Sequence, residues 1–159
     1  IATHSDQALK MLSDPTQEET AILGAIPYQP NDVVLHSDAS LLPKSKRAWS
    51  SWNYHLLNED KPAAAVSYNM NILQRLRSQD DFIVTLNRTE AINPNFIHFS
   101  TVYEHPLFGT KATVAQARRE EISGKNRTHY CGAYWRNGFH EDGAFSALAV
   151  AKHFGKELE

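Results

Sequence analysis

Between residues 32 and 103 the chain alternates short apolar segments with short polar links, and this pattern restricts the fold more than any other feature. The segments are rich in β-branched and aromatic residues, as is typical of β-strands. Parallel strands need a long crossover between them, whereas most of these links are short. The pattern therefore predicts an antiparallel sheet. Its expected strands are 32–38, 48–57, 64–70, 82–86 and 97–103.

Helical patterns occur in the sequence before, between and after these expected strands. Ser5 and Asp6 can cap a short helix that runs to Leu12. Asp14 is expected to cap a second helix, which ends at Gly24. Further helices are expected at 71–77, 112–122 and 143–154, and short strands at 1–3 and 127–132. The sequence therefore predicts an α+β fold with an antiparallel sheet, terminal strands and a C-terminal helix.

Composition excludes several classes of protein. The 159 residues include 42% hydrophobic and 21% charged residues, as in a globular protein. The net charge of −2 gives no electrostatic reason to expect a nucleic-acid partner or a membrane surface. No apolar run approaches the roughly 18 residues that a membrane span requires. The single cysteine, Cys131, cannot form an internal disulfide and suits a reducing compartment, so a cytoplasmic protein is expected.

The sequence contains no complete motif for metal binding or catalysis. Its eight histidines are scattered and lack the spacings of zinc sites, so no metal site is expected. Neither a G-x-S-x-G nucleophile elbow nor a glycine-rich phosphate-binding motif occurs. The chain therefore lacks a complete nucleotide-phosphate site, and no catalytic residue is identified.

The stretch YCGAYWRNGFHEDGAFSALAVAKHFG at residues 130–155 is the most informative for function. It places a short apolar strand before an aromatic loop and an alanine-rich helix, which is expected to begin near Gly143. Gly143 and Ala144 would let a ligand approach the free N–H groups of that helix start, where an electron-rich or anionic group is favoured. In the alternative interpretation, Asp142 is simply the N-cap of the helix and has no role in binding.

This stretch resembles the C-terminal flavin-binding segment of the FAD-dependent amine oxidase and phytoene desaturase-like superfamily. More narrowly, the chain resembles the C-terminal half of flavoproteins encoded beside bacterial cyclopropane-fatty-acid synthases, and the flavoprotein-like N-terminal region of plant cyclopropane synthases. The matching segments are ATHSDQAL, LGAIPYQPNDVVLHSDASLLP, AWSSWNYH, VSYNMNILQ, FIVTLN and YCGAYWRNGFHEDG.

The resemblance implies a division of the chain. Residues 1–25 would hold the end of a strand and helices of an FAD-binding α/β domain, residues 26–110 an antiparallel substrate-side domain, and residues 111–157 a C-terminal FAD-binding segment. The dinucleotide-binding half of the FAD site would precede residue 1, so the chain alone is expected to be inactive. Separately, Leu158-Glu159 is expected to be the remnant of a purification tag.

The resemblance also implies which residues contact FAD and substrate. The cofactor-binding residues would be Gly132, Ala133, Tyr134, Gly138, Phe139, His140, Asp142, Gly143 and Ala144. The family commonly has a carboxylate at the position of Ala133, where it holds the ribityl chain, so this contact is missing or supplied otherwise. The substrate side would be lined by Trp49, Asn53 and His55 or by the opposite face with Trp52, and core packing explains these residues equally well.

Two functions follow as expectations. In the first, the chain is part of a flavin-dependent oxidoreductase that acts on an amine or a lipid-linked acyl chain. In the second, it is a non-catalytic flavoprotein-like module that binds a lipid-modifying methyltransferase. In either case the terminal strands would have bare edges, so they are expected to pair with each other or with a second copy of the chain, and the latter would give a homodimer.

Overall fold

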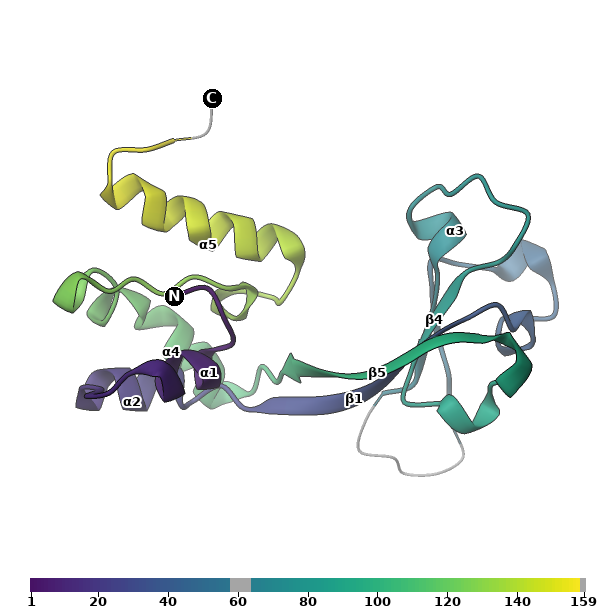
Figure 1. Ribbon diagram of the computed structural model, residues 1–159, viewed down its shortest axis with the longest axis horizontal. Coiled ribbons are helices and arrows are strands. Elements are labelled where there is room, and N and C mark those ends of the chain that lie inside the picture. The colour runs from purple at the N-terminus through teal and green to yellow at the C-terminus, as the bar shows by residue number, and fades with distance from the viewer. Residues whose placement is uncertain (58–63, 158–159) are drawn as a thin grey trace. The chain divides into compact units, whose positions relative to one another are not determined.

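The computed structural model describes residues 1–57 and 64–157, and the chain divides into two compact units. The helical unit comprises Ile1–Gln29 and the chain from His105 onward, and the sheet unit comprises Pro30–Glu104 (Figure 1). The fold is mixed α+β with an antiparallel sheet and a C-terminal helix, which confirms the predicted class. The expected tag remnant, Leu158-Glu159, lies outside the described residues.

Five strands of the described residues form one antiparallel sheet in the order β2-β3-β4-β1-β5 (Figure 1). They are β1 (Tyr28–His36), β2 (Trp52–Tyr54), β3 (Val66–Asn69), β4 (Ile83–Leu86) and β5 (Ile97–Pro106). Each lies within or across a segment that the alternating pattern predicts as a strand. Because Val34 faces Thr85, Thr85 faces Ser67 and Ser67 faces Asn53, these four side chains share one face of the sheet.

The bounds of the strands differ from the expected ones: β3 is Val66–Asn69 and not 64–70, β4 lacks residue 82, and β5 extends to Pro106 and not 103. The strand expected at 48–57 is reduced to Trp52–Tyr54, because Lys46–Ala48 form a 3₁₀ turn. The Trp49 indole N–H then donates to the carbonyl of Pro43 at 2.8 Å, which holds this side chain outside the sheet. The strand expected to begin at residue 32 begins at Tyr28.

The helical unit contains α1 (Ser5–Met11), α2 (Gln17–Leu23), α4 (Thr110–Ala117) and α5 (His140–His153), and the sheet unit contains the short α3 (Met70–Leu73). The core of the helical unit is formed by buried side chains from its helices, from the turns after them and from the segment before α5. These are Ala8, Ile22, Leu23, Ile26, Ala112, Ala115, Ile122, Tyr130, Tyr134 and Trp135. Deep in this unit, the Tyr130 hydroxyl donates to Glu19 Oε1 at 2.7 Å. Residues far apart in sequence therefore build one core.

The second helix begins later than the sequence predicts. Its N-cap is Thr16, whose Oγ1 accepts from the Glu19 N–H at 3.1 Å, while Glu19 Oε2 accepts from the Thr16 N–H at 2.8 Å. This reciprocal capping box satisfies two backbone donors. Asp14 is therefore not the cap, because the Thr-x-x-Glu pattern two residues on provides the better one.

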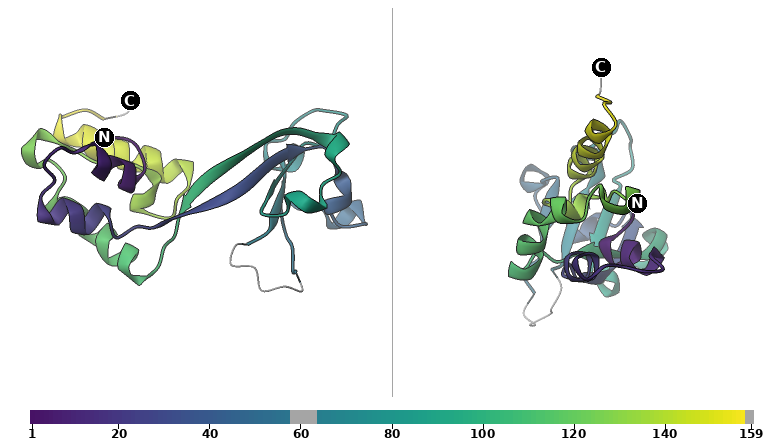
Figure 2. Two further views of the ribbon diagram at one scale, coloured as in Figure 1. Left: turned by 60° about the horizontal axis from the view of Figure 1, so that its bottom comes forward. Right: turned by 90° about the vertical axis from the view of Figure 1, so that its left-hand side faces the viewer.

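The two terminal segments pair with each other, as expected, but neither is a strand. The amino group of Ile1 donates to the carbonyl of His129 at 2.6 Å, and the Cys131 N–H donates to the carbonyl of Ile1 at 3.0 Å. Figures 1 and 2 show the N-terminus beside the segment that leads into α5. The contact has too few ladder bonds for strands at 1–3 and 127–132, so that assignment is wrong.

Candidate functional site

A cavity of about 530 Å³ lies in the helical unit where three parts of the chain meet. Ligand pockets have volumes of roughly 300–1,000 Å³, so this cavity is large enough for a small molecule or part of a cofactor. Its walls come from the N-terminal segment, the segment before α5 and α5 itself. The described residues that line it are Ala2, Thr3, His4, Gln7, Cys131, Gly132, Ala133, Gly143 and Ala147.

Gly143 leaves open space at the wall that α5 contributes. A Cβ built at this position would meet only the backbone nitrogen of Ala133, at 3.9 Å, which is an ordinary contact. Glycine within a helix costs about 0.5–1 kcal/mol relative to alanine. Since no neighbouring atom requires a glycine here, the packing of the protein does not explain this cost. The protein therefore leaves the space in front of Gly143 open.

Gly132 is required for packing instead. A Cβ at this position would overlap the ring of Tyr134, which is buried in the core. The Gly132 N–H donates to Ser146 Oγ at 2.8 Å, and the Ser146 hydroxyl donates to the carbonyl of Gly143 at 2.8 Å. Hydrogen bonds through Ser146 thus hold the segment before α5 against the helix next to the cavity.

The start of α5 differs from the prediction. The helix begins at His140, so the Gly143 N–H already donates to the Phe139 carbonyl at 3.2 Å within the helix. The prediction that Gly143 and Ala144 present free N–H groups is therefore wrong. A ligand in the cavity would meet the helix at its second turn.

Asp142 is not the N-cap residue either, although it does satisfy donors at the helix start. Its buried Oδ2 accepts from the N–H groups of Asn137 and Phe139, at 3.2 and 3.0 Å. Arg136 Nε lies 3.6 Å from its other oxygen. All of these contacts are within the loop and helix. Asp142 therefore has a structural role at the helix start, but as the third residue of α5 and not as its N-cap.

The other predicted cofactor residues have different surroundings. Gly132, Ala133 and Gly143 line the cavity together. Tyr134 packs in the core, and Phe139, His140 and Ala144 are exposed. Gly138 has a φ of +90°, and a Cβ there would come within 3.2 Å of the Phe108 ring. The structure therefore brings together only part of the predicted set.

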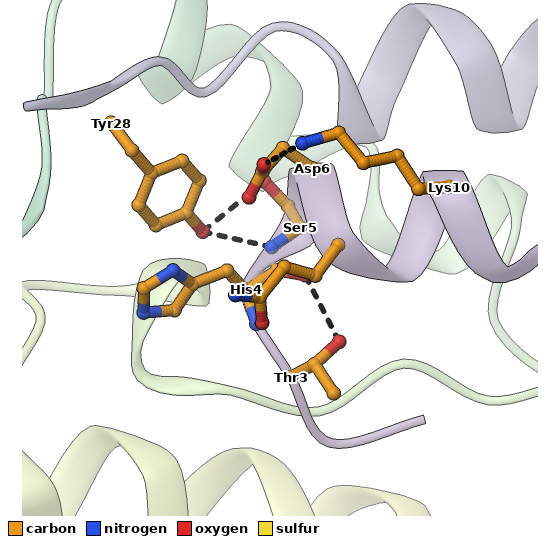
Figure 3. Close-up of polar contacts among 7 residues, drawn as sticks. Thr3, His4, Ser5, Asp6, Lys10 and Tyr28 are labelled. Atoms are coloured by element: carbon orange, nitrogen blue, oxygen red, sulfur yellow. Dashed lines mark hydrogen bonds and ion pairs between the residues drawn. The ribbon is translucent and has the colours of Figure 1, made fainter. Parts of the chain in front are cut away.

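The polar wall of the cavity comes from residues that the sequence analysis did not propose. His4 stacks on Tyr28 with ring centroids 4.4 Å apart and an angle of 15° (Figure 3). The Tyr28 hydroxyl accepts from the Ser5 N–H at 2.8 Å and donates to Ser5 Oγ at 3.2 Å, which fixes this stack against α1. Within the described residues, the buried Nδ1 atom of His4 has no hydrogen-bond partner.

His4 also takes part in the start of α1. Its N–H donates to Gln7 Oε1 at 3.3 Å, and both residues line the cavity. The N-cap of α1 is therefore His4, and the prediction that Ser5 and Asp6 cap this helix is wrong, because both lie inside it. The sequence pattern does not reveal that this helix start lines one cavity with Gly132 and Gly143.

The predicted substrate-side residues separate into three environments in the sheet unit. Asn53 and His55 both contact Ser67, through Asn53 Nδ2 to the Ser67 carbonyl at 3.2 Å and His55 Nε2 to Ser67 Oγ at 2.8 Å. Trp52 lies on the opposite face, half exposed and edge-on to Tyr68. Trp49 is outside the strand, beside Lys46. The alternation of faces in β2 is therefore as predicted, but Trp49 does not belong to it.

Comparison with known proteins adds no assignment: no family model and no curated protein matches the chain. Among the described residues, no group of three or more His, Cys, Asp or Glu side chains could hold a metal ion. None of the helices in that part of the chain is long and apolar enough to cross a membrane. The cavity and the sequence resemblance are therefore what supports a function.

Proposed function

We propose that this chain supplies the flavin-ring side of an FAD site, together with a substrate-side sheet, in a flavin-dependent oxidoreductase acting on an amine or acyl-chain substrate. The observation that carries the proposal is the open space in front of Gly143. It lies between segments of the chain that carry the resemblance to flavoproteins, at residues 2–9 and 130–143.

Short side chains along the wall of the cavity would suit a flat ligand. Ala2, Gly132, Ala133, Gly143 and Ala147 keep side chains short along its wall, so a planar ring can approach the backbone closely. These apolar surfaces exclude water from one side of a bound ring. A bound flavin would supply the hydride acceptor, and the residues of this chain would bind and orient it.

Polar recognition would come from the N-terminal wall. Thr3, His4 and Gln7 line this wall and carry polar side chains. A heteroaromatic ring edge carries donors and acceptors that such groups match.

The phosphates of FAD would have to be held elsewhere, because the chain has no glycine-rich phosphate-binding motif. The 159-residue chain alone should therefore bind FAD with a dissociation constant above about 1 μM. Titration of the chain with FAD, followed by quenching of flavin fluorescence, measures this. A tighter complex would contradict the half-site proposal.

A second function has one observation in its favour. No carboxylate is present among the described residues that line the cavity, and Ala133 occupies the position where the resembling family commonly has one. The chain would then be a non-catalytic module that binds a lipid-modifying methyltransferase. The absorption spectrum of the intact protein separates the two functions: flavin bands support the oxidoreductase, and a colourless protein that co-purifies with a methyltransferase supports the module.

A further inference from the structure

The buried face of the sheet contains a continuous row of four polar side chains. Ser67 and Thr85 are fully buried on neighbouring strands, and their hydroxyl oxygens are 2.6 Å apart. His36 Nε2 lies 2.7 Å from Thr85 Oγ1 at one end of the row. His55 Nε2 lies 2.8 Å from Ser67 Oγ at the other end. The row therefore has three contacts, in the order His36, Thr85, Ser67, His55.

The two ends determine where the imidazole protons lie. His36 Nδ1 accepts from the Asp38 N–H at 3.1 Å, so neutral His36 carries its proton on Nε2. His55 Nδ1 faces Arg88 Nη1 at 2.6 Å. Since a guanidinium can only donate, Nδ1 of His55 is the acceptor and its proton is also on Nε2. Burial lowers the pKa of both histidines, and Arg88 lowers that of His55 further, which keeps both rings neutral.

This arrangement has one proton too many. The two Nε2–H groups and the two hydroxyl protons make four donors, whereas the row has three contacts. A buried donor without an acceptor costs its full desolvation penalty. If His55 carried its proton on Nδ1, the Ser67 hydroxyl could donate to Nε2 and every contact would be satisfied. The Nδ1–H would then face Arg88, and two donors would oppose each other.

An acceptor that contacts both Arg88 Nη1 and His55 Nδ1 would resolve this conflict, and the two atoms, now 2.6 Å apart, would have to separate to admit it. A cavity of about 270 Å³ opens at these two side chains. Its described lining contains Arg88 as a cation and no carboxylate. The lining residues are Leu41, Leu42, Pro43, Asn53, Tyr54, His55, Leu56 and Arg88.

We propose that this cavity binds a carboxylate, which accepts hydrogen bonds from the Arg88 guanidinium and from Nδ1–H of His55. A carboxylate has two oxygens in one plane, which match the planar donors of arginine. The leucines offer contact to a short apolar chain on the same molecule. The inference uses contacts of the sheet unit alone, so it stands or falls independently of the flavin proposal.

The test is the tautomer of His55 in the full-length protein labelled with [15N]histidine, with sodium butyrate as the probe. Long-range ¹H–¹⁵N correlation spectra distinguish a proton on Nδ1 from one on Nε2. Without butyrate, His55 should carry its proton on Nε2. With saturating butyrate the proton should be on Nδ1. A His55 that keeps the Nε2–H form at saturation would overturn the proposal, and this result needs no variant.

Variants identify the binding group. Arg88→Gln should weaken butyrate binding at least about tenfold, because the charge-assisted contact is lost. Arg77→Gln is the matched control, since Arg77 is an exposed arginine of the same unit, and it should leave the affinity unchanged. Arg88→Gln that binds butyrate like the wild type would overturn the proposal. Tighter binding of inorganic phosphate than of butyrate would overturn the assignment to a carboxylate.

Discussion

The cavities of the helical unit and the sheet unit are built in opposite ways. The cavity of the helical unit is open because Gly132, Ala133 and Gly143 have short side chains or none. The cavity of the sheet unit is defined by functional groups, with Arg88 and His55 at its wall and buried hydroxyls behind them. A substitution that adds atoms should therefore damage the first site, whereas one that removes atoms should damage the second.

Gly132 of the helical cavity provides the largest expected effect in this comparison. Gly132→Ala should lower the free energy of unfolding by about 3 kcal/mol, the upper part of the range for overpacking, because the new Cβ overlaps the Tyr134 ring. Urea unfolding of the variant and the wild type measures the difference. A variant as stable as the wild type would show that the ring can move aside and that Gly132 is not a packing requirement.

The core of the helical unit depends on one buried hydrogen bond between distant segments. Tyr130→Phe should lower the free energy of unfolding by about 2 kcal/mol, because Glu19 loses the donor to its buried Oε1. Tyr103→Phe is the control, since Tyr103 is exposed, and it should change stability little. Equal effects of the two substitutions would argue against a stabilising role for the buried bond.

The polar row makes the sheet unit sensitive to acid. Burial lowers the pKa of His36, nearby Asp38 opposes this and His98 adds to it. The folded state therefore favours the neutral ring. The contribution of neutral His36 to the free energy of unfolding should be fully present above about pH 6.5, the pKa of an unfolded histidine. Below that pH the free energy of unfolding should fall by up to about 1.4 kcal/mol per pH unit.

Urea unfolding at pH 7.5 and pH 5.5 measures this loss. In His36→Gln the difference between the two pH values should be smaller than in the wild type. A His36→Gln variant with the pH dependence of the wild type would contradict the role given to His36.

The smallest expected effect has the opposite sign. Gly143→Ala should raise the free energy of unfolding by about 0.5–1 kcal/mol, because alanine is the better helix former and its Cβ meets only Ala133 N at 3.9 Å. Thermal unfolding in the absence of ligand measures the gain. Destabilisation would mean that packing needs this glycine, and the comparison with Gly132 would then lose its basis.

Local patterns predicted the sheet and most of its strands. The strands alternate apolar residues over short segments, and the links between them are short, so each was visible in a window of a few residues. Helix starts were harder because two capping patterns competed. Asp14 and Thr16 both precede the second helix, and only the reciprocal bonds of Thr16 with Glu19 decide between them.

The two sites depend on contacts that local patterns do not contain. The wall formed by Thr3, His4 and Gln7 faces Gly132 because Ile1 bonds to His129, which is 128 positions away in the sequence. Ser67 and Thr85 each look like ordinary polar residues in a strand. Only the register of the four strands β1, β4, β3 and β2 places them between His36 and His55. Strand register and long-range pairing depend on the tertiary fold, which patterns over a few residues do not contain.

The flavin content of the intact protein with Gly143→Leu, compared with Ala144→Leu, tests the central claim most directly. Both substitutions add the same side chain to neighbouring positions of α5, but only Gly143 lines the cavity, and Ala144 is exposed. We expect Gly143→Leu to lower flavin occupancy at least about tenfold while helix content is kept, and Ala144→Leu to keep the occupancy of the wild type. If Gly143→Leu retains full flavin occupancy, the space in front of Gly143 is not where the flavin binds.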